Sequence, residues 1–151
     1  MPSIDRADPV IMGHILAQHR ELHCQLLAVK ACLADAGPWD AGRSAAARAA
    51  LAGLREHLQS HFAQEEAGGF LEESITRVPR LAAAARRVMA DHAALLGELD
   101  GLIETLTAPD SAAARDRVAN GCERFMQHMI EHERSENAIV QEGYNEDLGL
   151  D

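Results

Sequence analysis

Apolar residues recur at alternating steps of three and four along most of the chain, which is the spacing of one face of an α-helix. The pattern covers four segments, which run from Val10 to about Ala36, from Asp40 to about Ala67, from Pro79 to about Leu106, and from residues 107–110 to about Val140. Alanine and leucine are abundant in the chain as a whole and favour helix. Because short connections join the segments, we predict an all-α fold, an up-down-up-down antiparallel four-helix bundle.

Capping signals support these boundaries. Helix starts are marked by Asp8-Pro9, by Asp40 and by the TAPD stretch at 107–110, and helix ends by Gly37-Pro38 and Gly68-Gly69. The final stretch, EGYNEDLGLD, is polar, and we expect it to be extended. The sequence therefore predicts a single domain over residues 1–151, with the bundle at about 9–140 and a polar tail at 141–151.

Each core stripe contains one histidine, and two of the four stripes add a glutamate one turn later. These residues are His19 on the first helix, His61 and Glu65 on the second, His92 on the third, and His132 and Glu136 on the fourth. In each His-x-x-x-Glu pair, the i, i+4 spacing puts both side chains on one helix face. The other stripe positions are apolar, so we expect these polar groups to point into the core. His57 lies off its stripe.

The stripe histidines also fall at about the same level of an antiparallel bundle. At a rise of about 1.5 Å per residue, the distance of His19 from the start of its helix matches that of His61 from the end of the next one to within a few residues. His132 is at a similar distance from the end of its helix, and His92 lies slightly deeper. We therefore expect four imidazoles and two carboxylates to converge on one layer of the core.

The two halves of the chain repeat this pattern. Each half has a single stripe histidine, followed about forty residues later by His-x-x-x-Glu. Aligning the halves on these positions also pairs His57 with His128 and His23 with Leu96. The repeat predicts a site with approximate twofold symmetry.

A metal centre explains why a core would contain such groups. Burying an ionised carboxylate without a counter-charge costs several kcal/mol, so the glutamates need a positive partner. Two divalent cations and a bridging hydroxide would leave the layer nearly neutral, with each histidine bound to one cation while Glu65 and Glu136 bridge the pair. Mixed imidazole and carboxylate ligands suit iron, ahead of manganese and zinc.

Composition and charge restrict the class of partner. The formal charge is -10, from 14 basic and 24 acidic side chains, and it repels phosphate backbones and anionic lipids. We therefore expect no nucleic-acid or membrane partner. No apolar run is long enough to cross a bilayer and the first residues lack a signal-peptide pattern, which favours a soluble cytoplasmic protein. Three cysteines, without Cys-x-x-Cys spacing, predict buried free thiols instead of disulfides.

The combined pattern of His19, HFAQE at 61–65, His92 and HERSE at 132–136 resembles that of the hemerythrin-like, or HHE cation-binding, domain. The resemblance extends over roughly residues 10–140. It implies a four-helix bundle around an oxo- or hydroxo-bridged, non-haem di-iron centre. The family is associated with binding oxygen, reacting with peroxide or nitric oxide, and sensing or handling iron. We therefore expect a small diatomic ligand or peroxide at the centre, and a partner protein for any output signal.

One departure from the family pattern concerns the number of ligands. Oxygen-carrying members have a second histidine one turn after the one on the third helix, and here that position is Leu96. With six ligands, each iron would keep an open position, which counts against oxygen carriage. If His23 joins as a seventh metal ligand, one iron is closed and the asymmetry of an oxygen carrier returns.

The remaining polar residues near the stripes have plainer interpretations. We expect His57 and His128 to lie behind the ligands or at the surface. We expect Glu66 and Glu133 to face solvent, with Glu133 as an alternative bridge between the metals because it directly follows His132.

Three functions remain open on the sequence. The first, ranked slightly ahead, is a binding or sensing protein whose di-iron centre takes up oxygen, nitric oxide or iron itself. The second is a redox enzyme that acts on peroxide or nitric oxide, so the chain is not assigned as an enzyme or a non-enzyme. The third is a metal-free interaction bundle whose histidines are satisfied by their neighbours.

Overall fold

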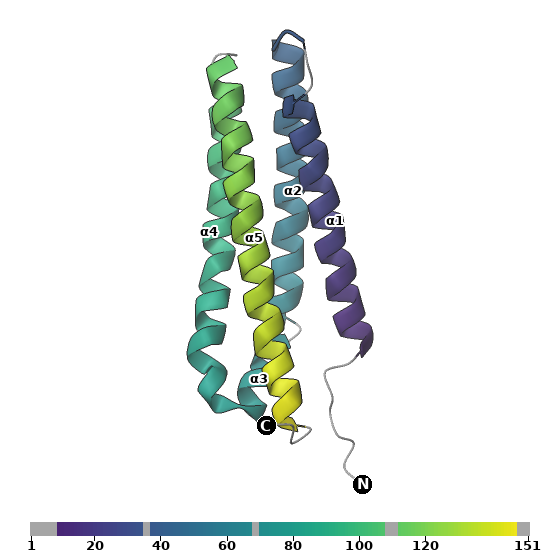
Figure 1. Cartoon of the computed structure of the whole chain (residues 1–151), viewed down its shortest axis with the longest axis vertical. Coiled ribbons are helices and arrows are strands. Elements are labelled where there is room, and N and C mark those ends of the chain that lie inside the picture. The colour runs from purple at the N-terminus through teal and green to yellow at the C-terminus, as the bar shows by residue number, and fades with distance from the viewer. Residues whose placement is uncertain (1–8, 35–36, 68–69, 108–111, 148–151) are drawn as a thin grey trace.

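The fold is a bundle of four long helices with a short helix at one end. The computed structural model describes residues 9–34, 37–67, 70–107 and 112–147, with side chains for all of them except 9–15, 70 and 144–147. Its elements are α1 (Pro9–Ala34), α2 (Ala41–Ala67), the short α3 (Phe70–Arg77), a 3-10 turn η1 (Pro79–Leu81), α4 (Ala82–Thr107) and α5 (Ala112–Asp147). Figure 1 shows the long helices running alternately up and down, which confirms the predicted all-α, up-down-up-down architecture.

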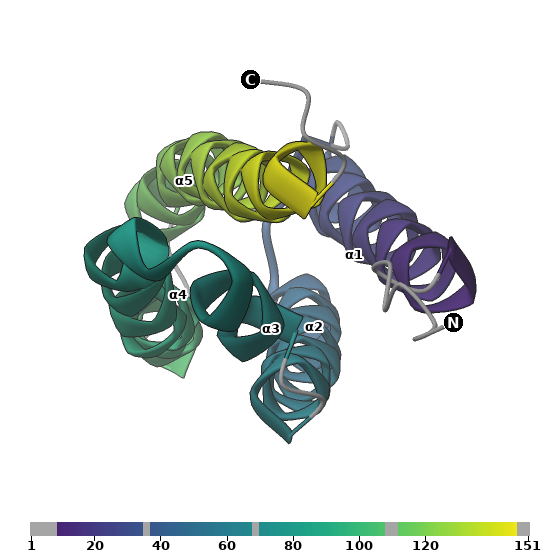
Figure 2. The same ribbon diagram turned by 90° about the horizontal axis from the view of Figure 1, so that it is seen from below.

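The four long helices enclose a common core. Contacts join α1 to α2, α2 to α4, α4 to α5, and α5 back to α1, and Figure 2 shows this ring along the bundle axis. The predicted apolar stripes face inward, and burying each large apolar side chain contributes about 1.5–3 kcal/mol. The largest fully buried apolar side chains are Leu51, Leu54, Leu58, Leu95, Leu99, Leu106 and Phe125.

The turn between α1 and α2 shows how the sequence ends one helix and starts the next. Gly37 has a φ of 130°, in a region that is open to glycine and strained for other residues. The Asp40 carboxylate accepts a hydrogen bond of 2.8 Å from the backbone N–H of Arg43, so it caps α2 as predicted. The signals expected at Asp8, at Gly68-Gly69 and at 108–110 lie outside the described residues.

The C-terminal part of the chain differs from expectation. The prediction that the stretch 142–151 is extended is wrong as far as Asp147, because α5 continues as a helix to that residue. Residues 148–151 lie outside the described ranges. The polar composition of this segment favoured an extended chain, but a helix needs only one apolar face in contact with a partner.

That partner is α3, a helix that the apolar pattern did not predict. α3 lies at the lower end of the bundle against the end of α5 (Figure 1). It is short enough that one buried face, including Leu71, gives little periodic signal. Leu71 and Val78 form an apolar cluster with the start of α4 and with Ile139 and Val140 of α5.

The core therefore consists of two apolar clusters with a polar layer between them. Along α4, Val88 belongs to the smaller cluster beside α3 and Leu95 to the larger cluster that fills the rest of the bundle. Along α5, Ile139 belongs to the smaller cluster and Met129 to the larger one. The stripe histidines and glutamates lie between these positions, so both faces of the polar layer are covered by packed hydrocarbon.

Two sequence expectations concern residues outside this core. The three cysteines are free thiols as predicted, but only Cys122 is buried, because Cys24 and Cys32 point away from the interior and are exposed. None of the described helices combines the length and the apolar character that a membrane span requires.

A substitution where α5 meets α3 tests the extension of α5. A Cβ atom added to Gly143 would lie 3.3 Å from the Cα atom of Ser74 and 3.0 Å from its hydroxyl oxygen. Gly143→Val should therefore lower the free energy of unfolding by about 1–3 kcal/mol through overpacking, measured as a lower Tm. Gly97→Val on α4 is the control, since nothing lies within 4 Å of its added Cβ. Equal melting of the two variants would contradict the contact between α3 and α5.

Candidate metal centre

The six polar residues of the predicted stripes meet in the layer between the two apolar clusters. None is more than 6% exposed. Their ligand atoms form two overlapping groups, and within each group all of them lie within 4.8 Å of one another. The α4–α5 group is Glu65, His92, His132 and Glu136, and the α1–α2 group is His19, His61 and Glu65. Because Glu65 belongs to both, the arrangement suits two cations that share a carboxylate.

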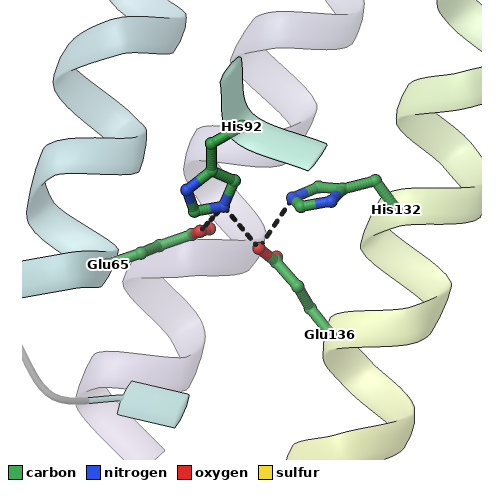
Figure 3. A group of neighbouring side chains, drawn as sticks. All are labelled: Glu65, His92, His132 and Glu136. Carbon is green, nitrogen blue, oxygen red and sulfur yellow. Dashed lines mark hydrogen bonds and ion pairs between the residues drawn. The ribbon is translucent and has the colours of Figure 1, made fainter. Parts of the chain in front are cut away.

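Figure 3 shows the α4–α5 group, in which two imidazoles face two carboxylates. Nε2 of His132 lies 2.8 Å from Oε1 of Glu136. Nε2 of His92 lies 3.2 Å from Oε2 of Glu65 and 3.5 Å from Oε1 of Glu136. The same edge of each imidazole, Nε2, therefore points at the carboxylates.

The α1–α2 group has the same orientation. Nε2 of His61 lies 2.6 Å from Oε1 of Glu65, one turn later on α2. Nε2 of His19 lies 3.9 Å from Oε1 of Glu65 and 3.8 Å from Oε2 of Glu136. His19 is thus too far from either carboxylate for a direct hydrogen bond, but close enough to share a cation with both.

Although these atoms lie close together, many of them lack hydrogen-bond geometry. Among the described side chains, the buried polar atoms without a hydrogen-bond partner include Nε2 of His19, His61 and His132, both carboxylate oxygens of Glu65, and Oε2 of Glu136. Leaving a buried polar atom unpaired costs about 1–3 kcal/mol. Nitrogen and oxygen donors that face one another without bonding to one another are what a cation requires, so the residues fit metal ions.

Three of the imidazoles are held from behind through Nδ1. His61 contacts the amide oxygen of Gln18 at 2.6 Å, His92 contacts Glu66 at 3.0 Å, and His132 contacts Asp91 at 3.3 Å. Such partners keep the proton on Nδ1 and leave Nε2 free to bind a metal.

Sequence reasoning missed these partners. Gln18 and Asp91 each directly precede a stripe histidine, His19 and His92, and each supports the histidine of the neighbouring helix. Their position directly before a stripe histidine was the signal in the sequence that could have indicated these partners. Glu66 was expected to face solvent, and its side chain is 50% exposed, yet it also holds His92.

The structure does not bring His23 into either group. Its Nε2 lies 3.0 Å from both carboxylate oxygens of Glu133, so the imidazole is already paired. The expectation that Glu133 faces solvent is wrong, because this residue is only 8% exposed. The contact with His23 gives the buried carboxylate a partner, and no bridging role follows from it.

His57 and His128 lie beside the stripes, as expected, and both are partly exposed. Nδ1 of His57 contacts Gln25 at 2.7 Å, and Nδ1 of His128 contacts Glu98 at 2.6 Å. Neither residue belongs to the two donor groups.

Phe62 is a further residue that the sequence pattern missed. Its ring stacks on His92 with centroids 3.9 Å apart and an interplanar angle of 7°. It also meets the ring of His132 edge-on at 5.5 Å. Phe62 lies one position from the predicted stripe of α2, directly after His61, where stepwise tracing of a single stripe cannot find it. Its ring covers the centre with a rigid apolar surface.

The electrostatics of the layer couple the imidazoles to the carboxylates. Burial alone would raise the pKa of Glu65, but contacts with the surrounding imidazoles hold that pKa well below its ordinary range. Burial alone would lower the pKa of His92, yet the nearby carboxylates, Glu136 foremost, raise it to about 10. The carboxylates likewise outweigh burial and raise the pKa values of His19 and His132. In metal-free protein, a proton on His92 therefore offsets part of the charge of the buried glutamates.

Comparison with known proteins gives one match. A family model described as the hemerythrin HHE cation binding domain matches residues 10–142, which is most of the chain. No curated protein and no solved structure matches.

Paired substitutions on α2 test the assignment of the ligands. His61→Ala removes a buried donor of the α1–α2 group and should lower the metal content of the purified protein, measured by elemental analysis. His57→Ala removes a partly exposed imidazole one turn earlier and should retain the metal. If His57→Ala loses metal as fully as His61→Ala, the ligand assignment on α2 is wrong.

Metal uptake should release protons. A metal binds neutral imidazole, whereas the nearby carboxylates raise the pKa of His92 to about 10 and so keep a proton on this ring at neutral pH. Protons and metal therefore compete, and the apparent metal affinity should fall as the pH falls. Calorimetric titration of metal-free protein at pH 7, in buffers of different ionisation enthalpy, measures the number of protons released. Binding without proton release would contradict the coupling.

Proposed function

The chain belongs to the hemerythrin HHE cation-binding domain family, and we propose that its buried centre holds two iron ions that bind a small diatomic ligand, oxygen or nitric oxide, or that sense iron itself. The observation that supports this most is the pair of donor groups that share Glu65. One group alone would fit a single cation, whereas two overlapping groups at one level fit a pair.

The chemistry of the donors favours iron. The six residues offer four imidazoles and two carboxylates, which is more than the four ligands that a structural zinc site takes. Imidazole and carboxylate together suit iron, and manganese is the next candidate. Bound iron would supply Lewis acidity and a change of oxidation state. The protein's own residues would supply the orientation, since Gln18, Glu66 and Asp91 hold three of the imidazoles in place.

Burial of the centre favours a small ligand without charge. The donors are almost fully buried, apolar clusters cover both faces of the layer, and Phe62 lies directly on His92. A polar organic substrate would have to desolvate in order to enter such a site, whereas a diatomic molecule would not. As a sensor, the protein would pass its signal to a partner protein.

A redox enzyme that acts on peroxide or nitric oxide is the second candidate, and the position of His23 favours it. His23 is paired with Glu133 and is therefore not placed to close one of the metals. A centre with six ligands keeps more room for a reacting molecule than a centre with seven.

The aerobic protein, purified without added metal, tests the proposal. Elemental analysis should find about two iron ions per chain, and the absorption spectrum should show near-ultraviolet bands that the polypeptide lacks. Reversible spectral change under oxygen or nitric oxide would support binding, and turnover of peroxide or nitric oxide would support the enzyme. Fewer than about one iron per chain would contradict the di-iron centre.

A further inference from the structure

The twofold pattern of the chain extends to the residues behind the metal ligands. Aligning the halves pairs Gln18 with Asp91, just as it pairs the two histidines that they contact. Nδ1 of His61 lies 2.6 Å from the amide oxygen of Gln18. Nδ1 of His132 lies 3.3 Å from a carboxylate oxygen of Asp91. The geometry is repeated, but a neutral amide in the first half has become a carboxylate in the second.

The same exchange occurs one turn further from the centre. The alignment pairs Gln25 with Glu98, and these residues contact Nδ1 of His57 at 2.7 Å and of His128 at 2.6 Å. Again the first half has an amide and the second a carboxylate. Two independent positions therefore differ in charge in the same direction.

In the second half, these groups form a continuous chain that leads to the centre. Nδ1 of His128 contacts Glu98, and its Nε2 lies 3.7 Å from Oδ1 of Asp91. The other oxygen of Asp91 contacts His132. Glu66 adds a second carboxylate behind the α4–α5 group, at Nδ1 of His92.

In the first half, the corresponding groups are neutral or lie further out. Nε2 of His57 lies 3.6 Å from the carboxylate of Glu21, whose side chain is 70% exposed. The side-chain NH2 of Gln18 donates to Gln64 at 2.8 Å. Glu133 is buried near His19, but its carboxylate contacts His23, which belongs to neither donor group.

The nature of the partner on Nδ1 changes the strength of the bond that Nε2 makes to a metal. A carboxylate that accepts the Nδ1 proton draws it away from the ring, which makes Nε2 a stronger donor, and the negative charge also attracts the cation. An amide oxygen orients the ring without adding charge. Removing such a partner typically costs 10- to 100-fold in metal affinity.

We propose that the two cation positions of the centre are unequal, and that the carboxylates behind the α4–α5 group make it the tighter position, which fills first. The α1–α2 group, held by Gln18, is the weaker and exchangeable position. This inference rests on the proposed function, because it requires a centre with two cations. The α4–α5 group also has four donor residues, whereas the α1–α2 group has three. The test must therefore separate the effect of donor number from the effect of the carboxylates that contact Nδ1 of the histidines.

Titration of metal-free protein with Co²⁺ tests the inequality. Calorimetry and the visible absorption of bound cobalt should resolve two binding events whose affinities differ by about 10-fold or more. His61→Ala, which damages the α1–α2 group, should retain the tighter event. His132→Ala, which damages the α4–α5 group, should retain only the weaker one.

Reciprocal exchange of the partners separates charge from donor number. Asp91→Asn keeps the size of the side chain and should weaken the tighter event about 10- to 100-fold, whereas Asp91→Glu should retain much of it. Gln18→Glu should strengthen the weaker event, which damage to the fold could not do. The double variant should reverse or remove the difference between the events. Unchanged Tm values of the metal-free variants would show that each bundle is intact.

The outcomes distinguish the two proposals. If no cobalt binds to the wild-type protein, the metal centre itself is wrong. Two events of equal affinity would leave the centre in place and overturn the inequality. Two unequal events that neither Asp91→Asn nor Gln18→Glu changes would assign the inequality to donor number, and would overturn the role of these two positioning residues.

Discussion

The structure depends on two carboxylates, Glu65 and Glu136, that are each no more than 4% exposed in the middle of a helical bundle. Their charge must be balanced inside the protein, because water cannot solvate it there. One histidine from each of the four long helices arrives at the same level with Nε2 facing these carboxylates. Protons on the imidazoles can balance the charge, but they leave many polar atoms without hydrogen bonds. Cations satisfy both requirements, which is why the site is best understood as a metal centre.

The two sides of this centre differ although the chain is internally doubled. Phe62 occupies the position that corresponds to Glu133, and Leu96 corresponds to His23. One side of the layer is therefore lined by an aromatic ring stacked on His92, and the other by the partly buried contact between His23 and Glu133. Together with the exchange of amides for carboxylates behind the ligands, this makes an approximately symmetric scaffold chemically asymmetric. The buried imidazoles and carboxylates define the candidate metal centre, and the residues around them make its two sides chemically different.

The sequence was sufficient for the parts of the fold that have a long period. Four stripes with a spacing of three and four placed the long helices, and one polar residue in each stripe identified the layer where they meet. The sequence was insufficient where a helix is too short to show a period, and where a residue lies one position beside an apolar stripe. α3 is too short to show a period, and without α3 the polar end of α5 had no visible partner. Glu133 and Phe62 each lie one residue from a stripe, at positions where burial depends on the neighbouring helix. The contacts of Gln18 and Asp91 depend on how two helices face each other, which a single stripe does not contain.

The position of the metal within the bundle tests the shared centre more directly than any other measurement. Crystals of the aerobic protein, measured at X-ray energies on both sides of the iron absorption edge, would locate iron by its anomalous scattering. We expect two iron peaks within the polar layer, one beside His92 and His132 and one beside His19 and His61, with Glu65 next to both. Iron at a single position, or iron-replete crystals with no peak between these side chains, would contradict the shared centre on which the rest depends.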